Sequence, residues 1–305
     1  MLLPLIQSAI NISEGRRPEI LQAIVRAAES SGVTVADWSA DIDHNRMVIT
    51  LLGDPTAIRH GALAVGRIAV EQIDLRGHSG AHPRMGAVDV VPVTPIQGIT
   101  MEECVLLSKE IAEDFADKLG VPVYLYEKSA RPGRRAALPA IRKGGFEGLF
   151  SGPLAGNRAP DVGPHQPHAT AGVTVVGARS PLIAYNINLD SNQVSIARQI
   201  AAAIREQRDT NPALTGVRAL GFWLASQKRA QVSLNLTRPD LTPMPAIFDF
   251  VREQAAQMSA NVYESEIVGL APRSALDGQS PERILWRDFR ETQLVDLWLE
   301  KLRTT

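Results

Sequence analysis

Apolar and polar positions follow one another along this chain with two different periods. In residues 20–28, apolar side chains recur every three or four positions, which is the period of a helix with one buried face. Residues 231–236 instead alternate between polar and apolar side chains, as a half-buried strand does. Asp54-Pro55 precedes one helical pattern and Gly32 follows another, and these residue types are typical of helix starts and ends.

The same order of elements is expected twice. In the first half we expect strands at 5–12, 33–39, 47–52 and 88–93 and helices at 20–28 and 55–73. In the second half we expect strands at 182–188, 217–224, 231–236 and 262–268, a helix capped by Ser191 that ends near 205, and a helix at 244–258. Each half has the order β-α-β-β-α-β, which is typical of a ferredoxin-like sandwich.

Further elements separate the two repeats. A helix at 101–119 and a strand at 121–126 follow the first repeat, and a loop-rich stretch spans 131–172. We therefore expect an α+β fold of two ferredoxin-like α/β sandwich subdomains, at residues 1–178 and 179–305. A ligand cleft is expected between them, because ligands often bind where two such halves meet.

Composition narrows the class of protein. The 305 residues are 45% hydrophobic, and 32 Lys and Arg stand against 33 Asp and Glu, for a net charge of -1. This content excludes a disordered chain, and the charge balance gives no reason to expect nucleic acid as a partner. Cys104 is the single cysteine, so no internal disulfide is possible, which fits a reducing compartment. Without an apolar run of membrane-spanning length, we expect a cytoplasmic protein that binds no membrane.

Residues 76–86 are the first candidate site. They place His78, His82, Arg76 and Arg84 among glycines, just before an apolar strand. A neutral imidazole beside cations is suited to proton transfer, and guanidinium groups are suited to carboxylates. His78 and His82 have the spacing of two metal ligands on one helix, but the glycines and Pro83 argue against a helix, so we expect no metal.

Residues 161–172 are the second candidate site. This loop is polar and rich in proline, contains His165 and His168, and leads into an apolar strand at 173–176. A rigid loop of this kind is suited to forming one wall of a ligand site. The residues alone indicate an enzyme or a binding protein for an anionic small molecule, and they leave the reaction open.

Ten short motifs, in order along the chain, carry a family resemblance. They are NISEG (11–15), DHNR (43–46), HPRMG (82–86) with Asp89, VPVYLY (121–126), LPAIR (138–142), PD with GP (160–164), GAR (177–179), NINL (186–189), AQVS (230–233) and VGL (268–270). In these motifs the sequence resembles glutamate formimidoyltransferase, the formiminotransferase domain of formimidoyltransferase-cyclodeaminase. The resemblance implies a two-lobed fold of ferredoxin-like halves and a homodimer.

The resemblance also implies a reaction and its residues. The family transfers the formimino group of N-formimino-L-glutamate to N5 of tetrahydrofolate in histidine degradation, with tetrahydrofolate as a co-substrate and no metal. His82 matches the catalytic histidine of the family. The folate-binding loop matches Gly163, Pro164, His165, Gln166, Pro167, His168, Ala169, Thr170, Ala171 and Gly172.

Four further residues are predicted from their type and their nearness to the motifs. We expect Arg46 and Arg84 to hold substrate carboxylates, and Asp41 or Asp43 to lie beside the cationic amidine. The sequence departs from a family member at Ser39 and Ala81, where that member has acidic residues, and inside the folate loop at 165–171.

Some interpretations stay open at this point. The vertebrate enzyme carries a cyclodeaminase after this region, so a separate cyclodeaminase is expected to act on the product. Formyl transfer between 5-formyltetrahydrofolate and glutamate remains an alternative, as does a folate-binding protein without catalysis. A metal-dependent hydrolase is a third.

Overall fold

A computed structural model describes residues 3–133 and 135–304, with side chains up to residue 301. Contacts within the chain divide it into two compact units, Met1–Ser180 and Pro181–Thr305. Each unit has its own hydrophobic core.

The first unit is built on a mixed sheet with the order β2-β3-β1-β4-β6-β5. Its strands are β1 (Leu5–Ile12), β2 (Thr34–Asp41), β3 (Arg46–Gly53), β4 (Val88–Gln97), β5 (Val123–Leu125) and β6 (Thr174–Ala178). Its helices are α1 (Pro18–Ser30), α2 (Pro55–Gln72), α3 (Met101–Leu119), α4 (Leu138–Ile141) and α5 (Gly145–Leu149), with short 3-10 turns η1 (Leu75–Gly77), η2 (Glu127–Ser129) and η3 (Gly156–Arg158).

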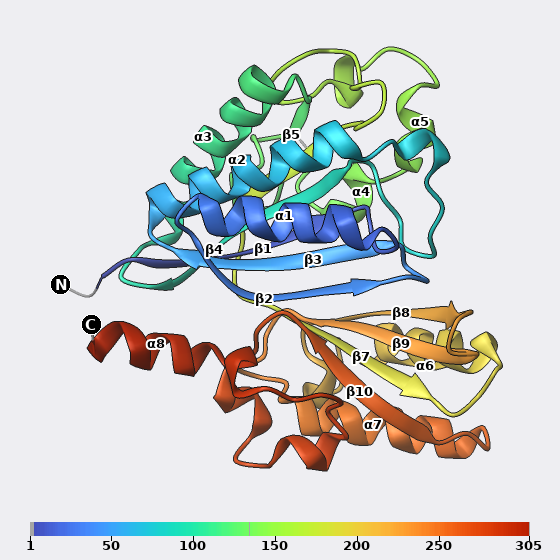
Figure 1. Cartoon of the computed structure of the whole chain (residues 1–305). Helices are drawn as coiled ribbons and strands as arrows, with labels where there is room; N and C mark the ends of the chain where they lie inside the picture. Colours follow the sequence, from blue (N-terminus) through green and yellow to red (C-terminus); the bar gives the residue numbers. More distant parts are fainter. Residues whose placement is uncertain (1–2, 134, 305) are drawn as a thin grey trace. The chain divides into compact units, whose positions relative to one another are not determined.

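The order β2-β3-β1-β4 is that of a ferredoxin-like sandwich, with the first strand between the third and the fourth. Helices α1, α2 and α3 cover one face of the sheet (Figure 1). Alternate residues of β1, including Ile6 and Ile10, are buried in the same core as apolar positions of α1 such as Ile24. This packing follows from the combination of a two-residue and a 3.6-residue apolar period. Strands β5 and β6 extend the sheet in parallel beyond β4.

The second unit repeats the topology in a four-stranded sheet with the order β10-β7-β9-β8. Its strands are β7 (Ile183–Leu189), β8 (Val217–Leu224), β9 (Arg229–Leu236) and β10 (Val262–Val268). Its helices are α6 (Val194–Gln207), α7 (Met244–Gln257) and α8 (Val295–Thr304), with 3-10 turns η4 (Pro212–Leu214), η5 (Arg273–Leu276), η6 (Pro281–Ile284) and η7 (Glu291–Gln293). The predicted repeat of β-α-β-β-α-β is thereby confirmed, and so is the α+β class.

One predicted helix start is wrong, whereas another is confirmed. Helix α6 begins at Val194 with Gln193 as its N-cap, and the Ser191 hydroxyl instead accepts from the Gln193 amide within the preceding loop at 3.2 Å. A cap must stand immediately before the first helical residue, and the chain needs two more residues to leave β7. Asp54 does cap α2, since its carboxylate accepts the Ala57 amide at 2.9 Å.

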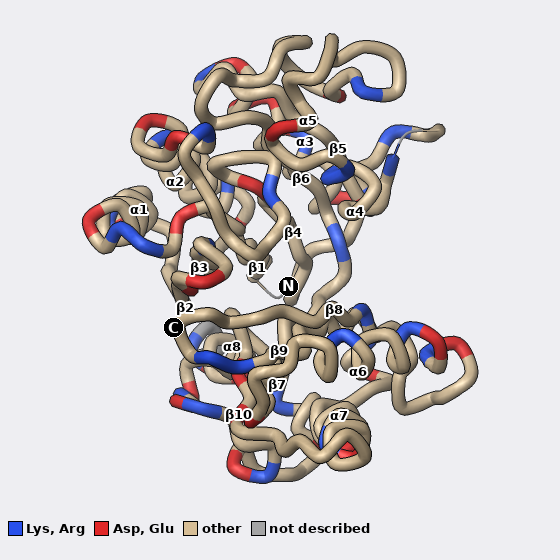
Figure 2. Tube along the Cα trace, turned by 90° about the vertical axis from the view of Figure 1, so that its right-hand side faces the viewer, with Lys and Arg blue, Asp and Glu red and all other residues tan. Residues whose placement is uncertain are grey.

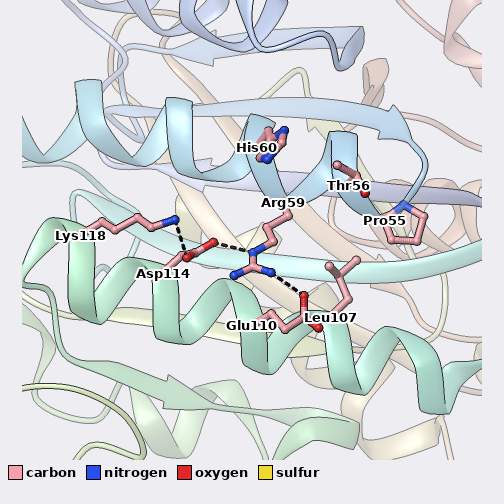
Figure 3. A pocket seen from close by; sticks show the side chains of 8 residues that line it. All are labelled: Pro55, Thr56, Arg59, His60, Leu107, Glu110, Asp114 and Lys118. Carbon is pink, nitrogen blue, oxygen red and sulfur yellow. Dashed lines mark hydrogen bonds and ion pairs between the residues drawn. The ribbon is translucent and has the colours of Figure 1, made fainter.

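Charged residues of both signs are interspersed over each unit (Figure 2). They also join helices to one another. A surface pocket between α2 and α3 contains Arg59, whose guanidinium donates to Asp114 at 2.6 Å and to Glu110 at 2.7 Å, and Lys118 also contacts Asp114 (Figure 3). These ion pairs link two neighbouring helices of the first unit.

Candidate active site

The loop at 76–86 is held against the β2–β3 turn by backbone contacts. The Ala81 amide donates to the Asp43 carbonyl at 3.0 Å, and the Asn45 side chain donates to the Ser79 carbonyl at 3.0 Å. A Cβ at Gly80 would lie 2.3 Å from the His44 carbonyl oxygen, so this approach needs a glycine. The two segments therefore form one rigid support for the side chains between them.

His82 is fixed by hydrogen bonds at both ring nitrogens. Its Nδ1 lies 2.8 Å from the Pro83 carbonyl, and its Nε2 lies 2.6 Å from Nη1 of Arg46. A carbonyl only accepts and a guanidinium only donates, so the partners assign the ring proton to Nδ1 and a lone pair to Nε2. His82 is therefore a neutral imidazole.

The surroundings of His82 keep it in this neutral form. Burial of the ring lowers its pKa well below the usual 6.5, and the positive charges of Arg46 and Arg142 lower it further, while the bond to the Pro83 carbonyl acts in the opposite direction. The His44 ring lies edge-on, with 6.0 Å between the ring centroids. At neutral pH the ring therefore carries no proton on Nε2.

His78, in the same loop, has the opposite tautomer. Its Nδ1 accepts from Nε of Arg84 at 2.9 Å, so Nε2 carries the proton and donates to the Asn45 carbonyl at 2.9 Å. Arg84 also donates to the His78 carbonyl at 2.8 Å and forms an ion pair with Glu147 of α5 at 2.8 Å. Arg84 thus has partners within the chain, and its predicted contact with a substrate carboxylate stays a prediction.

Asp41 and Asp43 lie in the turn that supports the His82 loop. One carboxylate oxygen of Asp41 accepts the amides of Asp43 at 2.8 Å and His44 at 2.7 Å, which fixes the turn. Arg46, the first residue of β3, faces Asp41 across the hairpin. The structure brings these residues together with His82, whereas their predicted contacts with substrate stay predictions.

Sequence reasoning gave no role to Asp89 and Arg142, which complete the site. Asp89 of β4 is 2% exposed, accepts the Met85 amide at 2.7 Å, and forms a close ion pair with Arg142 at the end of α4. An acidic residue inside an apolar strand signals a buried partner, and that signal is present in the sequence at Asp89. Arg142 closes the LPAIR motif 53 residues away, but no local pattern identifies it as the partner of Asp89. A small pocket is lined by side chains that include His44, Arg46, His78, His82, Arg84 and Asp89.

The predicted folate loop lies beside the His82 loop. Its end pairs with the segment that follows His82, because Ala87 donates to the Ala171 carbonyl at 2.9 Å and Gly86 forms an isolated bridge with Gly172. The His168 and Gly172 backbones exchange two hydrogen bonds of 2.9 Å that close the loop. Residues Gly163, Pro164, His165 and Gln166 are exposed. The structure therefore brings together the two segments that the sequence singled out.

Two glycines give this loop its path. Gly163 has φ +89, and a Cβ there would lie 2.8 Å from Ala116 Cβ. Gly172 has φ +68, and a Cβ there would lie 2.1 Å from the Met85 carbonyl oxygen. Both conformations disfavour other residues, which explains the glycine at each end of the loop.

Among residues 3–133 and 135–301, no group of three or more His, Cys, Asp and Glu side chains converges as metal ligands would. Over the same residues, no helix has the length and apolar content needed to cross a lipid bilayer.

Comparison with known proteins identifies relatives of both units. Residues 5–179 match "Formiminotransferase domain, N-terminal subdomain", and residues 184–280 match "Formiminotransferase domain". A glutamate formimidoyltransferase of Streptococcus pyogenes is 42% identical over 87% of this chain and 88% of that protein. One of Thermoplasma acidophilum is 37% identical over 98% of both chains.

Longer relatives contain a matching part. The formimidoyltransferase-cyclodeaminase of Gallus gallus is 41% identical over 89% of this chain but only 51% of its own length. Among solved structures, pitrilysin aligns with 83% of this chain and 34% of its own at 10% identity and a TM-score of 0.20, which is too low to support an argument. From the two matched domains and the identities over most of its length, the chain belongs to the formiminotransferase family.

Proposed function

We propose that this protein transfers the formimino group of N-formimino-L-glutamate to N5 of tetrahydrofolate, giving 5-formiminotetrahydrofolate and L-glutamate in histidine degradation. Relatives that match over most of their length carry the name glutamate formimidoyltransferase. In this chain the observation that carries the proposal is the neutral imidazole of His82, with its lone pair on Nε2. Removal of the N5 proton requires a base of this kind.

The proposed chemistry is a transfer through a tetrahedral intermediate. N5 forms a bond to the amidine carbon while Nε2 of His82 takes the N5 proton. The same proton then passes to the glutamate nitrogen, whose bond to the carbon breaks. L-glutamate leaves, the second nitrogen stays on the transferred carbon, and His82 returns to its neutral form. The electrons and protons balance without any further reactant.

The neighbouring groups are proposed to position the substrates. Arg46 and Arg84 offer paired N–H donors to carboxylates, and Asp41 or Asp43 balances the positive charge of the amidine. The exposed part of the loop at 163–172 is proposed to hold tetrahydrofolate as a co-substrate. Its support in this chain is the pairing of that loop with residues 85–87, next to His82.

A coupled turnover assay tests the proposal. The protein is mixed with tetrahydrofolate and N-formimino-L-glutamate, and purified cyclodeaminase is added to convert the product to a chromophore. We expect turnover that the His82→Ala variant loses while folate binding persists. Folate binding without turnover by the unmodified protein would contradict the proposal, and a parallel assay with 5-formyltetrahydrofolate and glutamate would then decide whether a formyl group is transferred instead.

We further propose that the protein works as a homodimer in the cytoplasm. The dimer rests on the family resemblance, and light scattering of the purified protein measures it. The compartment rests on Cys104, which is fully buried on α3 and has no disulfide partner. Burial raises the pKa of the Cys104 thiol to about 11, so this group stays protonated and unreactive.

A further inference from the structure

The lone pair that His82 needs for catalysis is already occupied. Nη1 of Arg46 donates to Nε2 of His82 at 2.6 Å, and Nε2 is the nitrogen without a proton. A base in this arrangement has no free orbital for the N5 proton. The hydrogen bond from Arg46 must therefore break before His82 acts.

The arginine is built so that only its side chain moves. Arg46 pairs with Asp41 at the closed end of the β2–β3 hairpin, and a Cβ at Gly15 would lie 2.6 Å from the Arg46 amide nitrogen. The backbone is thus packed tightly against a neighbouring segment. The half-buried side chain has four rotatable bonds, and its guanidinium prefers a carboxylate, with two parallel hydrogen bonds, over a single neutral nitrogen.

We propose that Arg46 masks His82 in the free enzyme and leaves it only when a carboxylate of the glutamyl substrate draws the guanidinium away. This inference rests on the proposed function and assigns Arg46 a second action beyond substrate binding. The hydrogen bond from Nη1 of Arg46 to Nε2 breaks, a guanidinium–carboxylate pair forms, and Nε2 becomes available. Nε2 of His82 can then accept a proton only when the glutamyl substrate is bound.

The other charged groups around His82 do not provide this switch. Arg142, at the end of α4, is held by Asp89 of β4, so its charge is partly balanced and fixed in place. His44 of the hairpin turn meets the ring edge-on, with centroids 6.0 Å apart. His78 and Arg84, in the same loop as His82, are bonded to each other. Among the contacts described, Arg46 is the cation that donates to Nε2.

The test follows the His82 ring by NMR as the pH is changed. The ring resonances of His82 are those missing from the spectrum of His82→Gln. The titration is repeated with L-glutamate or glutarate added, and sodium chloride at equal ionic strength is the control. In the free enzyme we expect protonation of His82 well below pH 6.5. Either dicarboxylate should raise the pKa, because the guanidinium donor and its charge leave the ring.

Variants of Arg46 separate masking from a structural role. Arg46→Gln should raise the pKa of His82 without any ligand and abolish the response to dicarboxylates. Arg46→Lys keeps the charge without the paired donors, so His82 should keep a lowered pKa and respond only weakly to dicarboxylates. If Arg46→Gln does not fold, a full response to dicarboxylates in Arg46→Lys overturns the masking. Arg59→Gln, on the α2–α3 surface of Figure 3, is the matched control and should leave His82 unchanged.

The outcomes also separate this inference from the proposed function. An unchanged pKa of His82 in Arg46→Gln, or a wild-type ring that ignores both dicarboxylates, overturns the masking even if the enzyme turns over. A ring that responds to glutamate in a protein without formimino transfer supports the masking and contradicts the proposed function. The pH profile of kcat/KM adds a second readout, since its acid limb should move to higher pH in Arg46→Gln.

Discussion

The two units share one strand order but differ in the chemistry they carry. All six histidines of the sequence lie in the first unit, and the second has none. In the first unit, loops at the strand ends bring His82 next to Arg46 and within the field of Arg142. The same topology in the second unit supports a different set of polar groups.

In the second unit the polar groups of the sheet satisfy one another. Arg287 contacts both Glu264 and Glu266 of β10 at 2.7 Å, and these acids accept the side-chain amides of Asn188 and Asn186 on β7 at 2.9 Å. Such a closed network stabilises a sheet and leaves little charge for a reaction. The two units therefore differ in the side chains that their loops bring together, not in strand order.

The largest effect is expected from removing the histidine itself. His82→Ala should lower kcat by about 10²- to 10⁴-fold, the usual contribution of a general base. Arg287→Gln in the second unit is the counterpart and should affect stability more than rate. Steady-state kinetics and a folate-binding titration on both variants measure this. An equal loss of kcat in the two variants would contradict the assignment of the catalytic groups to the first unit.

The next largest effect is expected from breaking the Asp89–Arg142 ion pair. Asp89→Asn leaves Arg142 charged, largely buried and without its acid, so the free energy of unfolding should fall by about 3–5 kcal/mol. Glu266→Gln in the second unit should cost less, because Glu264 still pairs with Arg287. Urea unfolding at pH 7 compares the two. A larger loss of unfolding free energy in Glu266→Gln than in Asp89→Asn would contradict this prediction.

Two glycines with similar backbone angles allow a matched test of the folate loop. Gly172 has φ +68 and no room for a Cβ, whereas Gly278 has φ +72 with nothing within 4 Å of a Cβ. Ala at either site should cost about 1 kcal/mol of backbone strain. Only Gly172→Ala should also push the loop away from Met85 and weaken folate binding. Calorimetric titration with folate, with the unfolding free energy as a control, measures both effects.

The smallest effect concerns the ion pairs of Asp114. Its hydrogen bond with Arg59 lowers its pKa below the usual 3.8, and Lys118 adds to this, while burial opposes both. A lowered folded-state pKa gives stability that is present above the unfolded-state value and is lost as the pH falls through the folded value. Asp114→Asn should therefore cost at most about 1 kcal/mol at pH 7, and progressively less as the pH falls below 3.8 through the lowered folded-state pKa. Asp249→Asn, at an acid between two arginines in the second unit, is the matched variant.

The sequence predicted most of the fold because the fold depends on local periods. The strand at Leu5–Ile12 and the helix capped by Asp54 follow directly from alternation and turn chemistry. The predicted cap at Ser191 was wrong because the preference of serine for N-caps does not fix the length of the loop between β7 and α6. The predicted cleft and the boundary between 178 and 179 as a functional division stay predictions.

The site was less accessible to sequence reasoning than the fold. His82 and Arg46 came from motifs, but their contact depends on a hairpin and a loop that meet through Gly80. The pairing of Asp89 with Arg142 joins positions 53 residues apart. Contacts of this kind depend on tertiary packing, so no periodic pattern in the sequence predicts them.

The buried thiol of Cys104 has a practical consequence. With a pKa raised to about 11 and no exposed surface, it does not compete for maleimide reagents at neutral pH. A cysteine introduced on each unit would therefore be labelled without removing the native one. Paired fluorophores at those positions would measure the distance between the two units in single molecules, with and without substrate.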